Sequence, residues 1–148
     1  MTAILNDIIA IGGTTAYTDA VSEGYIRDRI SDAPETSAWH VAETEAGEIV
    51  GFQWVARGAD YLPMDAAEIA TFAKAGQQGL GIGSKLFEAT RHAAKALGYR
   101  WINANIRADN ASGLTYYQSR GFEDYGKIEG LRLADGTVVD KILKRFDL

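Results

Sequence analysis

The sequence predicts a single α/β domain whose β-sheet combines parallel and antiparallel strands. The chain has 148 residues and shows no linker, low-complexity run or internal repeat, so residues 1–148 are expected to form one domain. A strand–helix–strand succession between residues 66 and 106 calls for a locally parallel strand pair. Hairpin patterns on either side call for antiparallel pairing. The predicted sheet is therefore mixed.

The N-terminal part contains two segments whose patterns differ in clarity. The apolar run at residues 3–11 is compatible with a strand or a short helix, because periodicity does not separate the two at this length. Gly12-Gly13 ends this segment. Apolar residues at helical spacing predict a helix over residues 19–31, with Thr18-Asp19 as its N-cap.

The middle of the chain predicts three strands and a long helix. Strands at residues 39–43 and 48–57 are joined by a short loop containing Gly47, and residues 66–73 read as a third strand. A helix follows from about residue 82 to residue 97, and Gly98 is placed to end it. Its predicted buried stripe consists of Ile82, Leu86, Ala89, Ala93 and Leu97.

The C-terminal part predicts a strand, a short helix and a final hairpin. The strand covers residues 99–106, and Asn110 begins a short helix that ends at Arg120-Gly121. Strands at residues 122–128 and 138–146 then follow, with a turn at Asp135-Gly136 between them.

Composition excludes several classes of function. The chain has no cysteine, which excludes disulfides, thiolate metal sites and a cysteine nucleophile. Its formal charge is −5, with 15 Lys and Arg against 20 Asp and Glu, so nucleic-acid binding is not expected. No apolar run approaches the roughly 18 residues of a membrane span, and residues 1–11 do not resemble a signal peptide. We expect a cytoplasmic protein without a membrane partner.

A glycine-rich loop lies between the third strand and the long helix. Gly79, Gly81 and Gly83 allow close approach of the backbone to a ligand, and the helix start offers unpaired N–H groups that suit a phosphate. A simple connecting turn is the alternative. The order Gly83-Ser84-Lys85 does not match a P-loop, and the spacing does not match a dinucleotide-binding fingerprint.

Two motifs together resemble the GCN5-related N-acetyltransferases, the GNAT superfamily. Gln78-x-x-Gly81-x-Gly83 is similar to the acyl-CoA loop of that family. The segment from Asn110 to Phe122 is similar to its second signature, with Asn110, a helix carrying Tyr117, and then Gly121-Phe122. Gly113 stands where the family usually has alanine, and the first 17 residues do not show the family's opening strand clearly.

The resemblance implies both a fold and a reaction. The implied fold is a mostly antiparallel mixed sheet with a central, splayed parallel strand pair and flanking helices. The implied reaction moves an acetyl group from acetyl-CoA to a primary amine of a small molecule or peptide, by direct attack in a ternary complex. Proximity and orientation supply most of the rate enhancement in such a complex, and no metal is required.

The resemblance also assigns roles to individual residues. The expected cofactor-binding residues are Phe72, Ala73, Gln78, Gly79, Leu80, Gly81, Ile82, Gly83, Ser84 and Asn110. Gln78 is neutral where many relatives have arginine, which removes a charge-assisted contact to the pyrophosphate. Asn110 could equally act as the N-cap of the short helix that it begins, instead of contacting the pantetheine arm.

Two residues are candidates for proton transfer. Tyr117 matches the family's general acid, while packing on the apolar face of its helix is the competing explanation. Tyr116 points to another side of the helix and is the natural control. Glu68 is the candidate general base, and a surface carboxylate is its alternative role. Glu23, Asp60 and Asp65 are candidates for binding a cationic acceptor.

Two rival functions remain open at this point. One is a GNAT-like acyl-CoA-binding or sensor module without turnover, favoured by the neutral Gln78 and the uncertain base. The other is a nucleotide-binding protein, which the failed spacings disfavour. A homodimer is compatible with the family, although no residue in the sequence demonstrates it.

Overall fold

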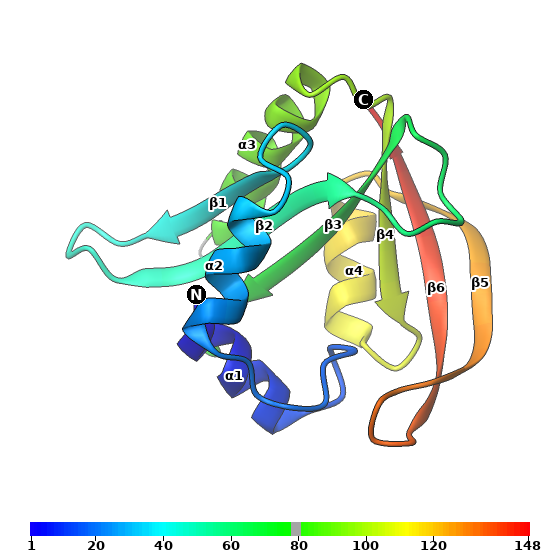
Figure 1. The fold of residues 1–148 in the computed structure, drawn as a ribbon, viewed down its shortest axis with the longest axis horizontal. Helices are drawn as coiled ribbons and strands as arrows, with labels where there is room; N and C mark the ends of the chain where they lie inside the picture. Colours follow the sequence, from blue (N-terminus) through cyan, green and yellow to red (C-terminus); the bar gives the residue numbers. More distant parts are fainter. Residues whose placement is uncertain (78–80) are drawn as a thin grey trace.

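The computed structural model describes residues 1–77 and 81–148, so Gln78, Gly79 and Leu80 lie outside the described residues. The described chain folds into one six-stranded mixed sheet with helices on both faces (Figure 1). The strand order is β1-β2-β3-β4-β6-β5. The strands are β1 (Ala38–Glu43), β2 (Ile49–Arg57), β3 (Ala66–Ala73), β4 (Trp101–Arg107), β5 (Glu123–Arg132) and β6 (Val138–Asp147).

The N-terminal segment is helical, which resolves the alternative left open by its sequence. Helix α1 spans Thr2–Ile11, and α2 spans Glu23–Ser31. The predicted start of the second helix was wrong, because Ser22 and not Thr18-Asp19 is its N-cap. Ser22 Oγ accepts a hydrogen bond from Tyr25 N at 3.0 Å. Asn6 holds Val21 through two hydrogen bonds between side chain and backbone, which keeps the preceding segment out of the helix.

The central parallel pair diverges, as the resemblance to the GNAT superfamily implies. Strands β3 and β4 are paired from Ala66 and Trp101 to Ile69 and Ala104. Both strands continue beyond this register, and Figure 1 shows them separating from each other. All other neighbouring strands in the sheet are antiparallel. The mixed α/β fold with a splayed parallel pair is therefore confirmed.

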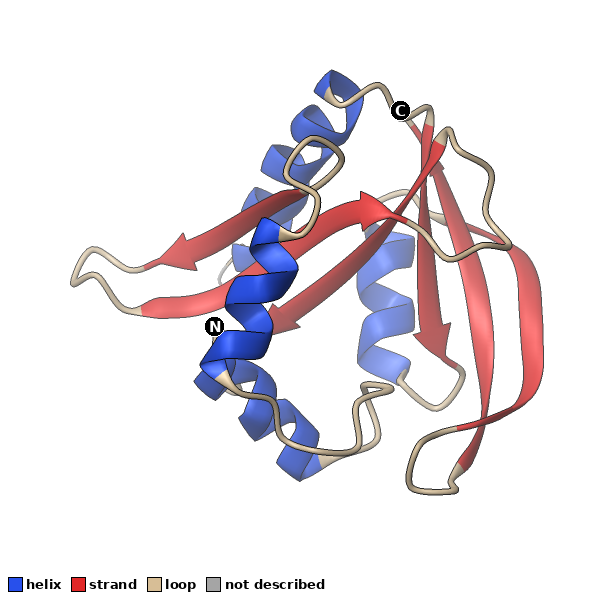
Figure 2. Ribbon diagram, in the orientation of Figure 1, coloured by secondary structure: helices blue, strands red, loops and turns tan. Residues whose placement is uncertain are grey.

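The sheet separates two apolar cores. Helices α3 (Ile82–Ala96) and α4 (Ala111–Ser119) cover one face, where Phe87, Ile102, Tyr117 and Phe122 are buried together. Helices α1 and α2 cover the other face (Figure 2), where Leu5, Ile26, Phe52 and Phe72 belong to the second core. Strand β3 contributes alternate residues to both cores, because successive side chains of a strand point to opposite faces.

The buried stripe of α3 differs from the predicted one. Its fully buried residues are Leu86, Phe87, Thr90 and Ala94, whereas Ile82, Ala89, Ala93 and Leu97 are only partly buried. The stripe is rotated because Phe87 packs against Phe122 and Phe146. Thr90, which looks polar in the sequence, is buried with its hydroxyl 3.2 Å from His40 Nδ1.

Candidate active site

The divergence of β3 and β4 leaves backbone groups open at the centre of the sheet. Residues 70–73 of β3 remain paired with β2, for example Phe72 with Phe52 and Ala73 with Gly51, but are not paired with β4. An extended ligand with amide groups can pair with such a strand edge. Phe72 itself is buried, and its ring stacks on Phe52 at 4.8 Å between centroids, so its side chain belongs to the core.

The start of α3 lies beside this opening and suits an anion. Gly81 is its N-cap with φ +75°, and within residues 1–77 and 81–148 no side-chain hydrogen bond caps the helix. The first-turn N–H groups of Ile82, Gly83 and Ser84 therefore remain available at the positive end of the helix dipole. Arg120 Nη1 donates to Ser84 Oγ at 2.6 Å, which places a cation at the same helix end. Of the predicted loop, Gly81 to Ser84 belong to the described residues, whereas Gln78, Gly79 and Leu80 lie outside them.

Gly83 is required by its neighbour on α4. A Cβ atom at Gly83 would lie 2.6 Å from Cε2 of Tyr116, closer than real Cβ contacts allow. Tyr116 also donates a hydrogen bond from its hydroxyl to Gly83 O at 2.7 Å. The ring of Tyr116 thus fixes the first turn of α3, and Tyr116 is not the inert neighbour that the sequence suggested.

A chain of hydrogen bonds connects Tyr116 to Tyr117 through the sheet. Gln53 Nε2 donates to Tyr116 Oη at 3.1 Å and to Thr71 Oγ1 at 2.7 Å. Thr71 Oγ1 in turn lies 2.8 Å from Tyr117 Oη. Thr71 belongs to the diverging part of β3, so this chain reaches the opening between β3 and β4.

Tyr117 is both a core residue and a polar group at this opening. Its side chain is only 7% exposed and packs against Phe122 at 5.1 Å between ring centroids. Burial raises the pKa of the Tyr117 hydroxyl well above its ordinary value, so the group is protonated at neutral pH. The two roles that the sequence left as alternatives are therefore compatible.

Glu68 lies on β3 with its side chain toward the α1–α2 face, opposite the face that holds Tyr117. It is paired with Asn103 in the parallel register and is half-buried. Burial raises the pKa of the Glu68 carboxyl group, while the Ala59 N–H and the charges of Lys141 and Arg29 act in the other direction. Ala59 N donates to Glu68 Oε2 at 3.3 Å. The two candidate proton-transfer residues thus approach the parallel pair from opposite faces.

A cluster of polar side chains surrounds Glu68 on its face of the sheet. Tyr61 Oη accepts hydrogen bonds from Asn103 Nδ2 and Asn105 Nδ2, both at 3.3 Å, and Tyr125 Oη donates to Asn103 Oδ1 at 2.5 Å. The sequence analysis did not identify this cluster. Its members come from the loop before β3, from β4 and from β5, which are far apart in the sequence. The only pattern in the sequence that indicates the cluster is the alternation of Asn103 and Asn105 with apolar residues along β4.

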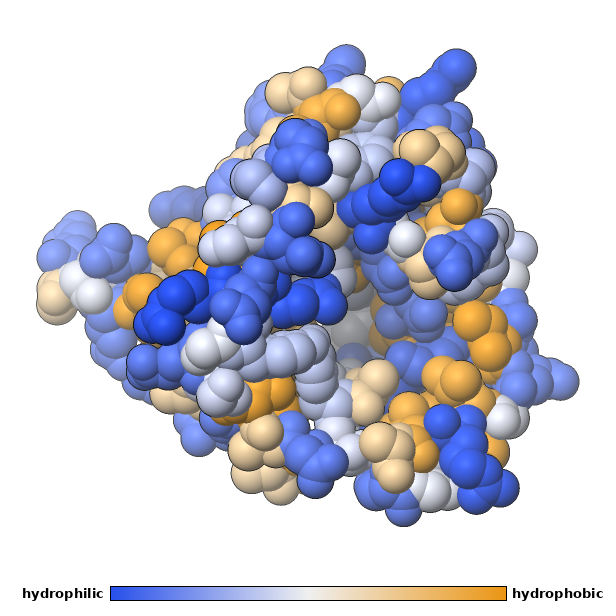
Figure 3. Space-filling view, in the orientation of Figure 1, coloured by the Kyte–Doolittle hydropathy of each residue, from blue (hydrophilic) through white to orange (hydrophobic). Residues whose placement is uncertain are grey.

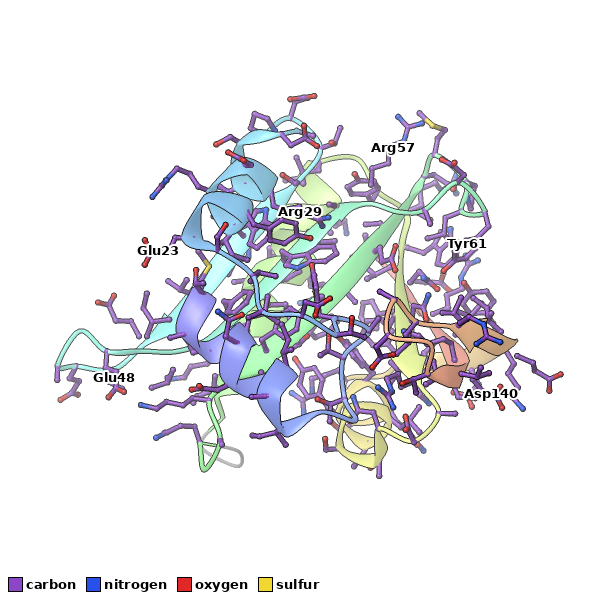
Figure 4. The ribbon with its side chains drawn as sticks, turned by 60° about the horizontal axis from the view of Figure 1, so that its bottom comes forward. Glu23, Arg29, Glu48, Arg57, Tyr61 and Asp140 are labelled. Atoms are coloured by element: carbon purple, nitrogen blue, oxygen red, sulfur yellow. The ribbon has the colours of Figure 1, made fainter. Side chains whose placement is uncertain are left out.

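The face of the molecule that carries α1 and α2 has a depression (Figure 2 and Figure 3). Figure 3 shows a depression in the middle of this face, between the part formed by α1 and α2 and the part formed by β5 and β6. Figure 4 shows Arg29 on α2 and Tyr61 on the loop between β2 and β3. The side chains of Glu23, Asp60 and Asp65 are all exposed. Asp65 lies directly before the first residue of β3, at the end of the strand where β3 is still paired with β4.

Asn110 caps α4, which is one of its two predicted roles. Its Oδ1 accepts from Gly113 N at 3.0 Å, and its Nδ2 donates to Thr14 O at 3.2 Å. A Cβ atom at Gly113 would lie 2.5 Å from Asn110 Nδ2, which explains glycine at a position where alanine is usual in the family.

The described residues lack two kinds of feature. Residues 1–77 and 81–148 contain no group of three or more His, Cys, Asp and Glu side chains arranged to hold a metal ion. None of the helices in these ranges combines the length and apolar character that crossing a membrane requires.

Comparison with known proteins gives consistent matches. A family model described as "Acetyltransferase (GNAT) domain" matches residues 35–124. The Bacillus subtilis protein YwnH, named as a candidate phosphinothricin acetyltransferase, is 29% identical over 149 residues, covering 99% of this chain and 86% of that protein. An L-methionine sulfoximine/L-methionine sulfone acetyltransferase of Pseudomonas paraeruginosa is 28% identical over 153 residues, with the same coverage.

A solved structure supports the fold. The phosphinothricin acetyltransferase of Sinorhizobium meliloti, determined in complex with AcCoA, superposes with a TM-score of 0.87 at 22% identity, covering 99% of this chain and 80% of that one. The family match spans more than half of the chain and includes the diverging strands, the start of α3 and the whole of α4. The chain belongs to the GNAT family of acetyltransferases and is an acyl-CoA-dependent N-acetyltransferase.

Proposed function

We propose that this enzyme transfers the acetyl group of acetyl-CoA to the primary amine of a small molecule by direct attack in a ternary complex. The observation that supports this best is the placement of Glu68 and Tyr117 on opposite faces of the diverging strands β3 and β4. Related proteins are named for acetylating small amino-acid compounds. When bound, acetyl-CoA supplies the activated thioester, and the residues of the chain position it and move protons.

The proposed binding residues combine the glycine-rich loop with the open edge of β3. In this proposal the segment Gln78, Gly79, Leu80, Gly81, Ile82, Gly83 and Ser84 holds the pyrophosphate through main-chain N–H groups. The open edge of β3 at Phe72 and Ala73 pairs with the amide groups of the pantetheine arm. Asn110 acts by capping α4 and so positions Tyr117.

Glu68 accepts the proton of the attacking amine. An alkyl amine with a pKa near 10.4 is about 3.4 units from neutral at pH 7, which corresponds to roughly 4.6 kcal/mol for deprotonation. A carboxylate whose pKa is raised by burial is a stronger base than an exposed one, so the environment of Glu68 favours this transfer. Glu68 first accepts the ammonium proton and passes it to solvent. The neutral amine then forms the N–C bond as the C–S bond breaks, and the proton that the nitrogen loses in this second step also goes to Glu68.

Tyr117 donates its proton to the departing thiolate. Thr71 Oγ1 accepts a hydrogen bond from Gln53, so the Thr71 hydroxyl proton is free to point toward Tyr117 Oη. That arrangement leaves the proton of Tyr117 available for sulfur. Solvent exchange then returns a proton to Tyr117 and removes the one on Glu68.

Two measurements test the proposal. Calorimetric titration with acetyl-CoA should show saturable binding, and its absence up to millimolar concentration would refute an acetyl-CoA-dependent function. Incubation with acetyl-CoA and a panel of amines should release free thiol only with accepted amines. Tight acetyl-CoA binding without thiol release for any amine would instead establish a binding or sensor module.

A further inference from the structure

A chain of hydrogen bonds joins the two tyrosines of α4, and Gln53 sets its direction. The side-chain amide nitrogen of Gln53 donates to Tyr116 Oη at 3.1 Å and to Thr71 Oγ1 at 2.7 Å. An amide nitrogen donates and does not accept, so both hydroxyl oxygens are acceptors in these contacts. Tyr116 passes its own proton to Gly83 O at 2.7 Å. The proton of Thr71 therefore points away from Gln53.

The hydroxyl proton of Thr71 is directed at Tyr117. Thr71 Oγ1 lies 2.8 Å from Tyr117 Oη, and an isolated pair of hydroxyl groups could bond in either direction. Within residues 1–77 and 81–148, the Thr71 hydroxyl is hydrogen-bonded to Gln53 and Tyr117 alone. Because polar groups in a protein interior are normally paired, Thr71 donates to Tyr117. Burial raises the pKa of the Tyr117 hydroxyl group, and the hydrogen bond with Thr71 acts in the other direction.

The proton of Tyr117 is then the one proton of this chain without an acceptor in the described part of the protein. Tyr117 Oη has Thr71 as its hydrogen-bond partner within residues 1–77 and 81–148, and it accepts in that contact. The side chain of Tyr117 is buried, so the protein interior supplies its surroundings. Thr71 lies beyond Ile69, the last residue of β3 that is paired with β4. An acceptor atom that enters the opening between β3 and β4 would complete the chain.

The direction of the chain matters when Tyr117 gives up its proton. A negative charge then develops on Tyr117 Oη, and the hydrogen bond from Thr71 becomes charge-assisted and stronger. The donation from Gln53 polarises the Thr71 hydroxyl and strengthens the same bond. An interaction that is stronger in the transition state than in the ground state accelerates the chemical step. Thr71 and Gln53 are therefore placed to favour proton release from Tyr117.

We propose that Gln53 and Thr71 are positioning residues for proton donation, because Gln53 fixes the direction of the hydrogen bond from Thr71 to Tyr117 and so directs the Tyr117 proton at the sulfur atom of the thioester. This inference rests on the proposed acetyl transfer and adds two residues to the same site. Both act through Tyr117. Gln53 lies on β2, fully buried, and Thr71 lies on β3.

The test uses substitutions that keep side-chain volume and remove a donor. Thr71→Val should lower kcat about 10- to 100-fold and leave the Kd for acetyl-CoA within about twofold, whereas Thr71→Ser should keep kcat within about threefold. Gln53→Met should lower kcat about 5- to 50-fold. Its Kd should change less than about threefold, because the hydrogen bond from Tyr116 to Gly83 remains. Gln53→Met also removes Gln53 Oε1, which is buried and has no hydrogen-bond partner in the described residues, so the variant should fold.

Two comparisons separate positioning from a merely structural role. In a Tyr117→Phe background, Thr71→Val and Gln53→Met should lower kcat no further, because the hydroxyl group through which they act is absent. Thr90→Val is the matched control, since Thr90 is fully buried on α3 and its hydroxyl lies beside His40, outside the chain. It should keep kcat within about twofold. An unchanged kcat in Thr71→Val would overturn the proposal, and so would equal losses with and without the Tyr117 hydroxyl.

A binding measurement distinguishes this result from failure of the proposed reaction. If no amine releases thiol, the ultraviolet absorbance of the thiolate gives the pKa of the thiol of CoA bound to each protein. The proton of Tyr117 should stabilise the thiolate and lower this pKa in the wild-type complex. Thr71→Val and Gln53→Met should reduce the shift, and Thr90→Val should retain it. Equal thiol pKa values in all four complexes, or no binding of CoA, would contradict the proposal.

Discussion

Adjacent tyrosines on α4 have different surroundings, and this difference separates binding from proton transfer. Tyr117 reaches Thr71 at the opening between β3 and β4, whereas Tyr116 reaches Gly83 at the start of α3. Gln53 is fully buried and connects the two tyrosines through Thr71, because it donates to Tyr116 Oη and to Thr71 Oγ1, which lies beside Tyr117 Oη. At the scale of single residues, the proposed site therefore has one hydroxyl group assigned to proton transfer, that of Tyr117, and another that positions the start of α3, that of Tyr116.

The first prediction concerns these two hydroxyl groups. Tyr117→Phe should lower kcat about 100-fold or more while the Kd for acetyl-CoA stays nearly constant, because only the proton donor is lost. Tyr116→Phe should instead raise the Kd for acetyl-CoA about 2- to 10-fold, because the first turn of α3 loses a hydrogen bond. Steady-state kinetics and calorimetry measure both quantities. An unchanged kcat in Tyr117→Phe would remove Tyr117 from the mechanism.

The second prediction concerns the pH dependence that Glu68 imposes. Burial raises its pKa in the folded protein, and only the ionised form accepts a proton. The value of kcat/KM should therefore fall as pH is lowered through this raised pKa. Glu68→Gln should lower activity and abolish this acidic limb. A limb that persists in Glu68→Gln would assign the base to another group.

The raised pKa of Glu68 also predicts how the stability of the protein changes with pH. Because the folded pKa of Glu68 is raised, the stability contributed by its protonated form is fully present below the unfolded pKa and is lost as pH rises through the folded pKa. The difference in Tm, Glu68→Gln minus wild type, should therefore increase as pH rises from the unfolded pKa through the folded pKa of Glu68, because only the wild type loses this stability. A series of thermal melts from acidic to neutral pH measures this difference.

At the scale of elements, the contact between α3 and α4 explains why the glycine-rich loop has a glycine at position 83. Gly81 adopts φ +75° as the N-cap, and Gly83 leaves room for the ring of Tyr116. The pattern of small residues in the loop therefore reflects packing between two helices as well as approach of a ligand. Arg120 at the end of α4 adds a third contact between the same helices through Ser84.

The third prediction tests this contact. Gly83→Ala should destabilise the protein by about 1–3 kcal/mol, because the new Cβ atom collides with the Tyr116 ring. It should also weaken acetyl-CoA binding. The double variant Gly83→Ala with Tyr116→Ala should recover part of the stability relative to the sum of the single effects, as a double-mutant cycle in urea denaturation measures. Strict additivity would show that the collision is relieved elsewhere.

Sequence patterns predicted those elements whose signals were local. The bounds of β3 and the N-cap of α4 at Asn110 followed from apolar runs and capping chemistry. The start of α2 did not, because Thr18-Asp19 and Ser22 have equal capping chemistry, and a tertiary contact from Asn6 selects between them. The polar cluster around Glu68 was also missed, since the order of the strands in the sheet brings its members together.

At the scale of the whole molecule, each of the two cores lies beneath a different half of the proposed site. The core beneath α3 and α4 supports the proposed acetyl-CoA side, with Phe87 and Tyr117 among its residues. The core beneath α1 and α2 supports the proposed acceptor side. The N-terminal segment is tied to both sides, because Thr14 O accepts from Asn110 and Thr15 O accepts from Arg107.

The fourth prediction distinguishes the two cores. Leu5 on α1 is 1% exposed, whereas Ile11 at the end of the same helix is 73% exposed. Leu5→Ala should lower the free energy of unfolding by about 2–5 kcal/mol, and Ile11→Ala should change it little, as urea denaturation measures. Because α1 packs on the acceptor side, Leu5→Ala should raise the KM of the amine more than that of acetyl-CoA. Equal increases in both KM values would mean that the two cores act as one cooperative unit and that the acceptor side has no separate support.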